Sequence, residues 1–180
     1  RRIWHMGCQD DPTPRHRAYR ELYRFMRPLG NGERETVLEA LRLQVGDDGQ
    51  GRPAYRALTP DEICQLAEGG LVEIGAHTVT HPVLSTQPPE VQRQEMAGSK
   101  QALEDILERP VATFSYPYGS WSEVGKTAMH LAREVGFEVA CANVPEPVTH
   151  RANPFWLPRF LVRDWDGDEF AKRLRMFFSG

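Results

Sequence analysis

Strand-like and helix-like segments alternate along the last two thirds of this 180-residue chain. Short apolar runs that suit strands begin near Val72, Val111 and Phe137, and a stretch with helical periodicity separates each run from the next. Parallel strands need such a crossover between them, and the crossover is usually a helix. The alternation therefore predicts an α/β fold with a mainly parallel sheet, and no repeat or low-complexity segment competes with it.

Prolines and capping residues mark where the helices should begin and end. Thr59 can cap a helix, Pro60 suits its first position, and Glu62 lies three residues after the cap. By such signals we expect helices over residues 13–27, 33–45, 59–68, 88–108 and 122–135, and a last helix that opens at Asp166 or Asp168. We expect strands from Val72 and over residues 111–116, 137–142 and 155–162, the last with Pro158 at an edge or bend.

Size and composition indicate one globular domain. The chain is 40% hydrophobic and 26% charged, which is ordinary for a folded protein of this length. We expect a single domain over residues 1–180, with a helical segment over residues 1–58 and a β/α core over residues 59–180. The net charge of -3 and the pI near 6.1 argue against a nucleic-acid binder and against a protein that binds anionic membranes.

Neither a membrane segment nor a leader is visible in this sequence. No apolar run approaches the length of a membrane span, and residues 1–6 lack the apolar centre of a signal peptide. The compartment stays open because the sequence does not begin with Met, and the cytoplasm is the default expectation. The oligomeric state is open as well. Three cysteines stand far apart without a C-x-x-C pair, which argues against a disulfide framework and a zinc ribbon.

Two histidines follow the first expected strand. His77 and His81 are four residues apart, and Pro82 directly after them stops a long helix from carrying them away. Neutral imidazoles at this spacing face the same side of a helical turn, and their nitrogens suit zinc, cobalt, nickel or iron better than magnesium or calcium. Parallel sheets place ligands at the carboxyl ends of their strands. The pair therefore predicts half of a metal site, and the alternative is two histidines that only bond backbone carbonyls.

Three segments, in this order and spacing, closely resemble the polysaccharide deacetylase family of carbohydrate esterases, the NodB-homology domain. They are Ile74–Ser85, Phe114–Gly119 and Leu157–Arg159. The resemblance implies a distorted (β/α) barrel that removes acetyl groups, usually from N-acetylated sugars, as a hydrolase of carbon–nitrogen bonds other than peptide bonds. It also implies a carbohydrate substrate and a divalent metal held by one Asp and two His, most simply zinc, with cobalt or nickel as alternatives.

The resemblance assigns roles to residues of the first two segments. His77 and His81 are the metal pair, and Thr78 matches the hydroxyl residue that braces the loop between them. Pro117 and Tyr118 fall in the motif that forms one wall of the substrate groove, where the backbone N–H of Tyr118 would help to hold the developing oxyanion. A plain turn that ends a strand is the alternative interpretation of residues 116–119.

Arg159 stands where the family usually has its general acid, a histidine. An arginine cannot act as an acid at ordinary pH, but it could stabilise a tetrahedral oxyanion or hold a sugar or phosphate group. His150, in a loop, and His130, inside an expected helix, remain candidate acids.

Tryptophans offer candidate contacts to a sugar substrate. Trp121, Trp156 and Trp165 could stack on sugar rings, and Trp156 is the expected substrate contact. Tryptophan more often fills a core, so this alternative stays open.

The acidic motif of the family is missing. It is a strand ending in T-F-D-D-G that supplies the catalytic base and the third metal ligand. Asp10-Asp11 precedes a helix cap, and Asp47-Asp48 lies in a glycine-rich loop, so neither pair follows an apolar strand. We expect the chain to begin after the first strands of the barrel, which leaves the barrel incomplete at its N-terminal end. A catalytically incomplete domain with a carbohydrate-binding or assembly role is therefore the rival hypothesis.

Overall fold

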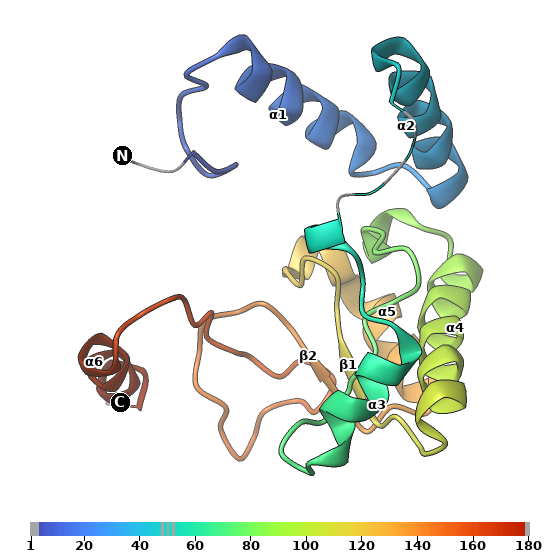
Figure 1. Cartoon of the computed structure of the whole chain (residues 1–180). Helices are drawn as coiled ribbons and strands as arrows, with labels where there is room; N and C mark the ends of the chain where they lie inside the picture. The colour runs from blue at the N-terminus through green and yellow to red at the C-terminus, as the bar shows by residue number, and fades with distance from the viewer. Residues whose placement is uncertain (1–3, 48, 50, 52, 179–180) are drawn as a thin grey trace. The chain divides into compact units, whose positions relative to one another are not determined.

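The computed structural model describes residues 4–47, 49, 51 and 53–178. These residues form two compact units that divide between Pro53 and Ala54 (Figure 1). The single domain expected over residues 1–180, with its internal boundary after residue 58, stays a prediction.

The first unit is built from α1 (Pro14–Met26) and α2 (Asn31–Val45). Thr13 caps α1, because its side chain accepts a hydrogen bond from the backbone N–H of His16, and a proline follows the cap. α2 ends at Gly46, whose φ of 66° is the left-handed conformation that closes many helices. Both helices therefore begin or end at signals that their own residues supply.

Arg20 is the buried polar centre of the first unit. Its Nε atom donates to both carboxylate oxygens of Asp11 at 2.9 Å, and its terminal nitrogens donate to the carbonyl oxygens of Met6 and Cys8. The hydrogen bond from Arg20 is the main reason why the pKa of Asp11 lies below its usual value. Asp11 is thus engaged in a structural ion pair.

The second unit holds the remaining helices and the strands. They are α3 (Pro60–Glu68), the 3-10 helix η2 (Leu84–Thr86), α4 (Pro89–Leu107), β1 (Thr113–Ser115), α5 (Trp121–Val135), β2 (Val139–Cys141) and α6 (Gly167–Phe178). A further 3-10 helix, η1, spans Pro53–Tyr55. Each expected helix is present, with ends within one turn of the expected ones. No helix within the described ranges is long and apolar enough to cross a membrane.

The sheet is parallel, as the alternation predicts. β1 and β2 pair along their whole length. Single parallel bridges extend the pair on both sides, from Ala76 to Phe114 and from Cys141 to Leu157. The four segments therefore follow one another in space in the same order as in the sequence. The mixed α/β fold is confirmed.

The extended strands expected from Val72 and over residues 155–162 are wrong, because each of these segments contributes one bridging residue. In the part of the chain that the structure describes, the first segment meets a neighbour on one side only and contains Gly75, which favours strands poorly. Pro158 interrupts the second segment, since proline has no N–H to donate. Pairing among the described residues is limited to β1, β2 and the two bridges, so a barrel and its incomplete end stay predictions.

The two faces of the sheet differ in character. Phe114 and Ala140 point into a buried core that is completed by side chains of α4 and α5, which lie side by side next to the strands (Figure 1). The next residues along the strands, Ser115 and Cys141, are only partly buried and line an open pocket. This alternation follows from the two-residue period of a strand. One face therefore stabilises the unit and leaves the other face for polar side chains.

Tyr116 ties the loop after β2 to this core. Its fully buried hydroxyl donates a 2.9 Å hydrogen bond to the carbonyl oxygen of Phe155. Burial also raises the pKa of the phenol well above its usual value. Tyr116 thus stays neutral and keeps the segment before Leu157 next to the sheet.

The start of α3 has a complete capping box. The side chain of Thr59 accepts from the N–H of Glu62 at 3.3 Å, and the carboxylate of Glu62 accepts from the N–H of Thr59 at 2.8 Å. Arg56 makes a bidentate contact with the same carboxylate, in which its two terminal nitrogens donate to the two carboxylate oxygens at 2.7 and 2.6 Å. The hydrogen bond from Arg56, followed by the one from Thr59, lowers the pKa of Glu62 to about 2.

We expect the side chain of Glu62 to titrate near pH 2 in an NMR titration. Because this pKa lies below the unfolded value of 4.5, Glu62 contributes stability that is fully present above pH 4.5 and is lost as the pH falls toward 2. Arg56→Gln should raise the pKa of Glu62, since it removes the main cause of the shift. An unchanged pKa in Arg56→Gln would contradict this interpretation.

Candidate metal-binding histidine site

His77 leaves the sheet immediately after the bridge at Ala76. Its Nδ1 atom lies 2.6 Å from the carbonyl oxygen of Ser115, on β1. A carbonyl oxygen only accepts hydrogen bonds, so Nδ1 is the donor, and in the neutral imidazole the lone pair is then on Nε2. Histidines that bind metals are held in this way, with the second nitrogen donating to a carbonyl or carboxylate.

The structure brings His77, His81 and Tyr118 together. The ring centroids of His77 and His81 are 4.8 Å apart and their planes are at 70°, and the rings of His81 and Tyr118 have the same separation at 73°. Both histidines are exposed. The expected metal pair thus forms one accessible cluster with a residue of the second sequence segment.

The loop between the histidines has an unusual backbone. Thr78 and His81 have φ angles of 67° and 55°, in the left-handed region that residues with a side chain rarely adopt. Such a conformation costs about 1–3 kcal/mol per residue and persists where surrounding contacts impose it. One such contact is the hydrogen bond from the N–H of His81 to the hydroxyl of Thr78, at 3.1 Å. Thr78 therefore makes the bracing contact that the family resemblance implies.

Glu95, on α4, contacts the same loop. Its carboxylate accepts hydrogen bonds from the N–H of Val79 at 2.9 Å, from the N–H of Thr80 at 2.8 Å and from the hydroxyl of Thr80 at 2.7 Å. Sequence analysis missed this residue. It stands in an expected amphipathic helix, where a charged side chain is normally a solvent-facing one, and no local spacing connects it to the histidines.

The turn after β1 is tight and left-handed. Tyr118 and Gly119 have φ angles of 61° and 81°, and the N–H of Gly119 lies 2.6 Å from the carbonyl oxygen of Pro117. The carbonyl oxygen of Gly119 then accepts from the N–H of Asn143, beyond β2. Pro117 is buried and Tyr118 is half-buried. The turn thus aims Tyr118 at His81 while it is anchored to the neighbouring strand.

A pocket of about 450 Å³ opens on the polar face of the sheet beside His77. Ser115, Cys141 and Arg159 line it as well, together with Glu73, which lies four residues before His77 along the first segment. The Oγ atom of Ser115 is buried without a hydrogen-bond partner among the described residues. Arg159, which the sequence separates from His77 by more than 80 positions, is therefore brought to the same pocket.

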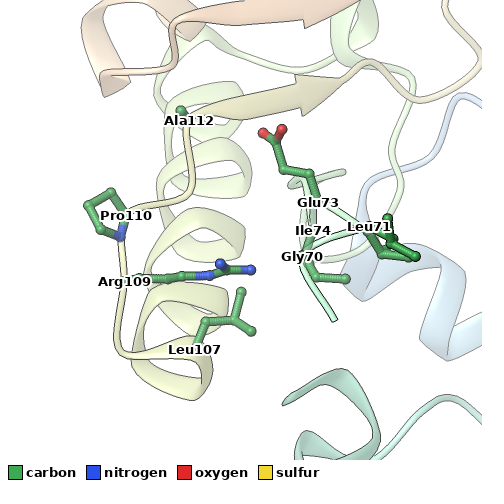
Figure 2. Close-up of a pocket in the computed structure, with 9 residues that line it drawn as sticks. Gly70, Leu71, Glu73, Ile74, Leu107, Arg109, Pro110 and Ala112 are labelled. Atoms are coloured by element: carbon green, nitrogen blue, oxygen red, sulfur yellow. The ribbon is translucent and has the colours of Figure 1, made fainter. Parts of the chain in front are cut away.

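A second pocket, of about 500 Å³, lies at the opposite end of the first segment. Gly70, Leu71 and Glu73 line one side, and Arg109, from the loop after α4, extends toward them from the other (Figure 2). Its residues precede β1 and the bridge at Ala76. It is therefore at the amino ends of the strands, where parallel sheets rarely place ligands.

Comparison with known proteins bears on this site. The profile of the family described as Polysaccharide deacetylase matches residues 35–140, more than half of the chain. The chain belongs to the polysaccharide deacetylase family. His77, His81, Pro117 and Tyr118 lie inside the matched range, whereas Trp156 and Arg159 lie beyond it.

Individual members of the family are similar over part of their length. YxkH of Bacillus subtilis (strain 168), which carries the name of a polysaccharide deacetylase, is 26% identical over 105 residues, or 58% of this chain and 36% of that protein. The deacetylase PplD of Streptococcus pyogenes, solved in complex with acetate, aligns with a TM-score of 0.54 at 22% identity, over 60% of this chain and 46% of that one. The BpsB deacetylase domain of Bordetella bronchiseptica aligns with a TM-score of 0.56 at 19% identity, over 64% of this chain and 53% of that one.

The chain thus spans between a third and about half of these deacetylases. The two solved structures, at these identities, establish a shared fold.

The described part of the chain shows no third metal ligand grouped with the two histidines. Among the described residues, no three His, Cys, Asp or Glu side chains form a group that could hold a metal ion. Asp11 is paired with Arg20, and Asp48 lies outside the described residues.

The remaining candidate residues are spread over the second unit. Trp156 is half-buried and packs edge-on against the exposed Trp121, with ring centroids 5.2 Å apart. Trp165 lies under the guanidinium of Arg173. The Nε2 atom of His130 lies 3.0 Å from a carboxylate oxygen of Glu134 on the surface of α5, and His150 is exposed in a turn. Their expected roles stay predictions.

We expect Gly119→Ala to disrupt the turn that presents Tyr118. A Cβ atom there would lie 2.7 Å from the backbone nitrogen and 2.8 Å from the Cβ atom of Asn143, in addition to the left-handed φ. Overpacking of this kind costs about 1–3 kcal/mol, measured as the free energy of unfolding in urea. Gly70→Ala is the matched control, because Gly70 has a φ of 65° but nothing within 4 Å of the added atom. Equal destabilisation by both substitutions would show that the contact with Asn143 is unimportant.

Proposed function

We propose that this chain carries the metal-binding half of a deacetylase site that removes acetyl groups from N-acetylated sugars or polysaccharides. The observation that carries the proposal is the arrangement of the histidine pair. The Nδ1 atom of His77 is bound to the carbonyl oxygen of Ser115, which leaves its Nε2 lone pair for a metal, and the ring of His81 lies 4.8 Å away.

A divalent ion suits this donor set. His77 and His81 offer neutral imidazole nitrogens, which favour zinc, with cobalt or nickel as alternatives. When bound, such an ion would polarise the acetyl carbonyl and lower the pKa of a water molecule toward neutrality.

The other residues of the site have roles in binding and charge stabilisation. The backbone N–H of Tyr118 and the guanidinium of Arg159 are the proposed donors to the oxyanion that forms on the acetyl group. Arg159 is a suitable donor because it remains protonated and shares a pocket with His77. Pro117 and Trp156 are the proposed contacts to the sugar. The acetate found with PplD is the product that this reaction would release.

A carboxylate must join the histidines for full activity, as third ligand and as base. Because the described residues contain no group of three His, Cys, Asp or Glu side chains that could hold a metal ion, a domain that binds carbohydrate without catalysis is the second candidate. The two candidates differ in the release of acetate and share the binding of sugar.

We expect the purified chain to bind zinc or cobalt weakly and to lose that binding in the variant with both His77→Ala and His81→Ala. Isothermal titration, with the visible spectrum of cobalt as a second readout, measures the change. His130→Ala with His150→Ala is the matched control, since both side chains are exposed and belong to the same unit. Unchanged binding in the His77 and His81 variant would contradict the metal assignment.

We expect acetate release from chitooligosaccharides or N-acetylated peptidoglycan fragments to depend on an added carboxylate. The assay compares this chain with a version extended at its amino end by an acidic first motif, each loaded with zinc. Release by the extended version alone would support the deacetylase proposal. Sugar binding without release in either version would support the second candidate, and full release by the short chain would show that a base is already present.

A further inference from the structure

The loop between the two histidines holds a conformation that its own sequence does not favour. Thr78 and His81 are both left-handed, and neither is a glycine. The two residues between them, Val79 and Thr80, present their backbone N–H groups to one carboxylate, that of Glu95. A single side chain of α4 therefore binds the N–H groups of both residues that separate the two left-handed residues.

The hydrogen bonds between Glu95 and the loop are strong. An ionised carboxylate that accepts N–H and O–H bonds at 2.7 to 2.9 Å makes charge-assisted hydrogen bonds, which are about twice as strong as neutral ones. Thr80 contributes its hydroxyl as well as its N–H, so the two carboxylate oxygens are both occupied by the loop. This fixes the orientation of the carboxylate as well as that of the loop.

The surface of α4 is shaped to receive this loop. Gly98 lies one turn after Glu95, and a Cβ atom at Gly98 would be 3.1 Å from a methyl carbon of Val79. Residues three apart share a face of a helix, so the carboxylate and the space for Val79 lie next to each other. Two features of α4 thus fit the loop. The carboxylate of Glu95 binds Val79 and Thr80, and the missing side chain at Gly98 leaves space for Val79.

We infer that Glu95 is a positioning residue that sets the spacing of the two imidazoles. His77 is fixed by its hydrogen bond to Ser115, so the conformation of residues 78–80 decides where His81 lies. Glu95 holds that conformation through the N–H groups of Val79 and Thr80 and the hydroxyl of Thr80. The consequence for metal binding rests on the proposed function, whereas the hold on the loop does not.

The test has one readout that needs no metal. In Glu95→Gln, we expect the amide protons of Val79 and Thr80 to exchange about 10-fold faster or more, the change that matches the loss of hydrogen bonds to a charged group. Nuclear Overhauser contacts between the rings of His77 and His81 should weaken in the same variant. Glu90→Gln is the matched control, because Glu90 lies on the same helix and its carboxylate accepts from the side chain of Gln94.

The second readout is the affinity for zinc. Partners of metal ligands typically change affinity about 10- to 100-fold, and we expect a loss of this size in Glu95→Gln and none in Glu90→Gln. Thr80→Val removes only the hydrogen bond from the hydroxyl to Glu95 and should give a smaller loss of zinc affinity. It is the test variant if Glu95→Gln does not fold. Circular dichroism checks the fold of each variant.

The outcomes separate the two proposals. Unchanged exchange and ring contacts in folded Glu95→Gln would overturn the role of Glu95. Faster exchange with a matching loss of zinc affinity would support it. If the unsubstituted chain binds no zinc, the metal proposal fails, and the exchange and ring contacts alone decide whether Glu95 positions the pair.

Discussion

The pairing of Ala76 with Phe114 is the interaction on which the candidate site depends. The N–H of Ala76 donates to the carbonyl oxygen of Thr113, and its own carbonyl oxygen accepts from Ser115, both at 2.9 Å. This one bridge fixes the register of the histidine segment against β1. It places His77 beside the carbonyl oxygen of Ser115, which in turn fixes the proton on Nδ1. A shift of one residue would turn His77 toward the core.

The different roles of the two sheet faces follow from the same register. Phe114 and Ala140 are buried against the helices, so the alternate positions, Ser115 and Cys141, are left for the pocket. The helices also serve the site directly, because Glu95 of α4 holds the loop between the histidines. The apolar face thus supplies a rigid support for exposed, polar and locally strained residues, which are the ones that chemistry requires.

Much of the fold could be predicted from local signals, and the rest depended on neighbours. Thr59, Pro60 and Glu62 mark the start of α3 through contacts within four residues of each other, so their prediction was reliable. The segment from Val72 has the composition of a strand, yet it pairs only at Ala76, since a strand exists only where a partner offers hydrogen bonds. Barrel closure depends on several such partners at once and was beyond local reasoning.

The sequence by itself determined the chemistry available to this deacetylase-family chain. The spacing of His77 and His81, the proline after them and the turn before Gly119 all lie within short stretches, where local geometry decides the outcome. Tertiary structure alone decided which distant groups meet them. Arg159 reaches the pocket of His77, and Glu95 binds the loop, because the parallel pairing and the packing of α4 bring together residues that no sequence spacing connects. The physical reason is that such contacts are set by the folding of the whole unit rather than by neighbouring residues.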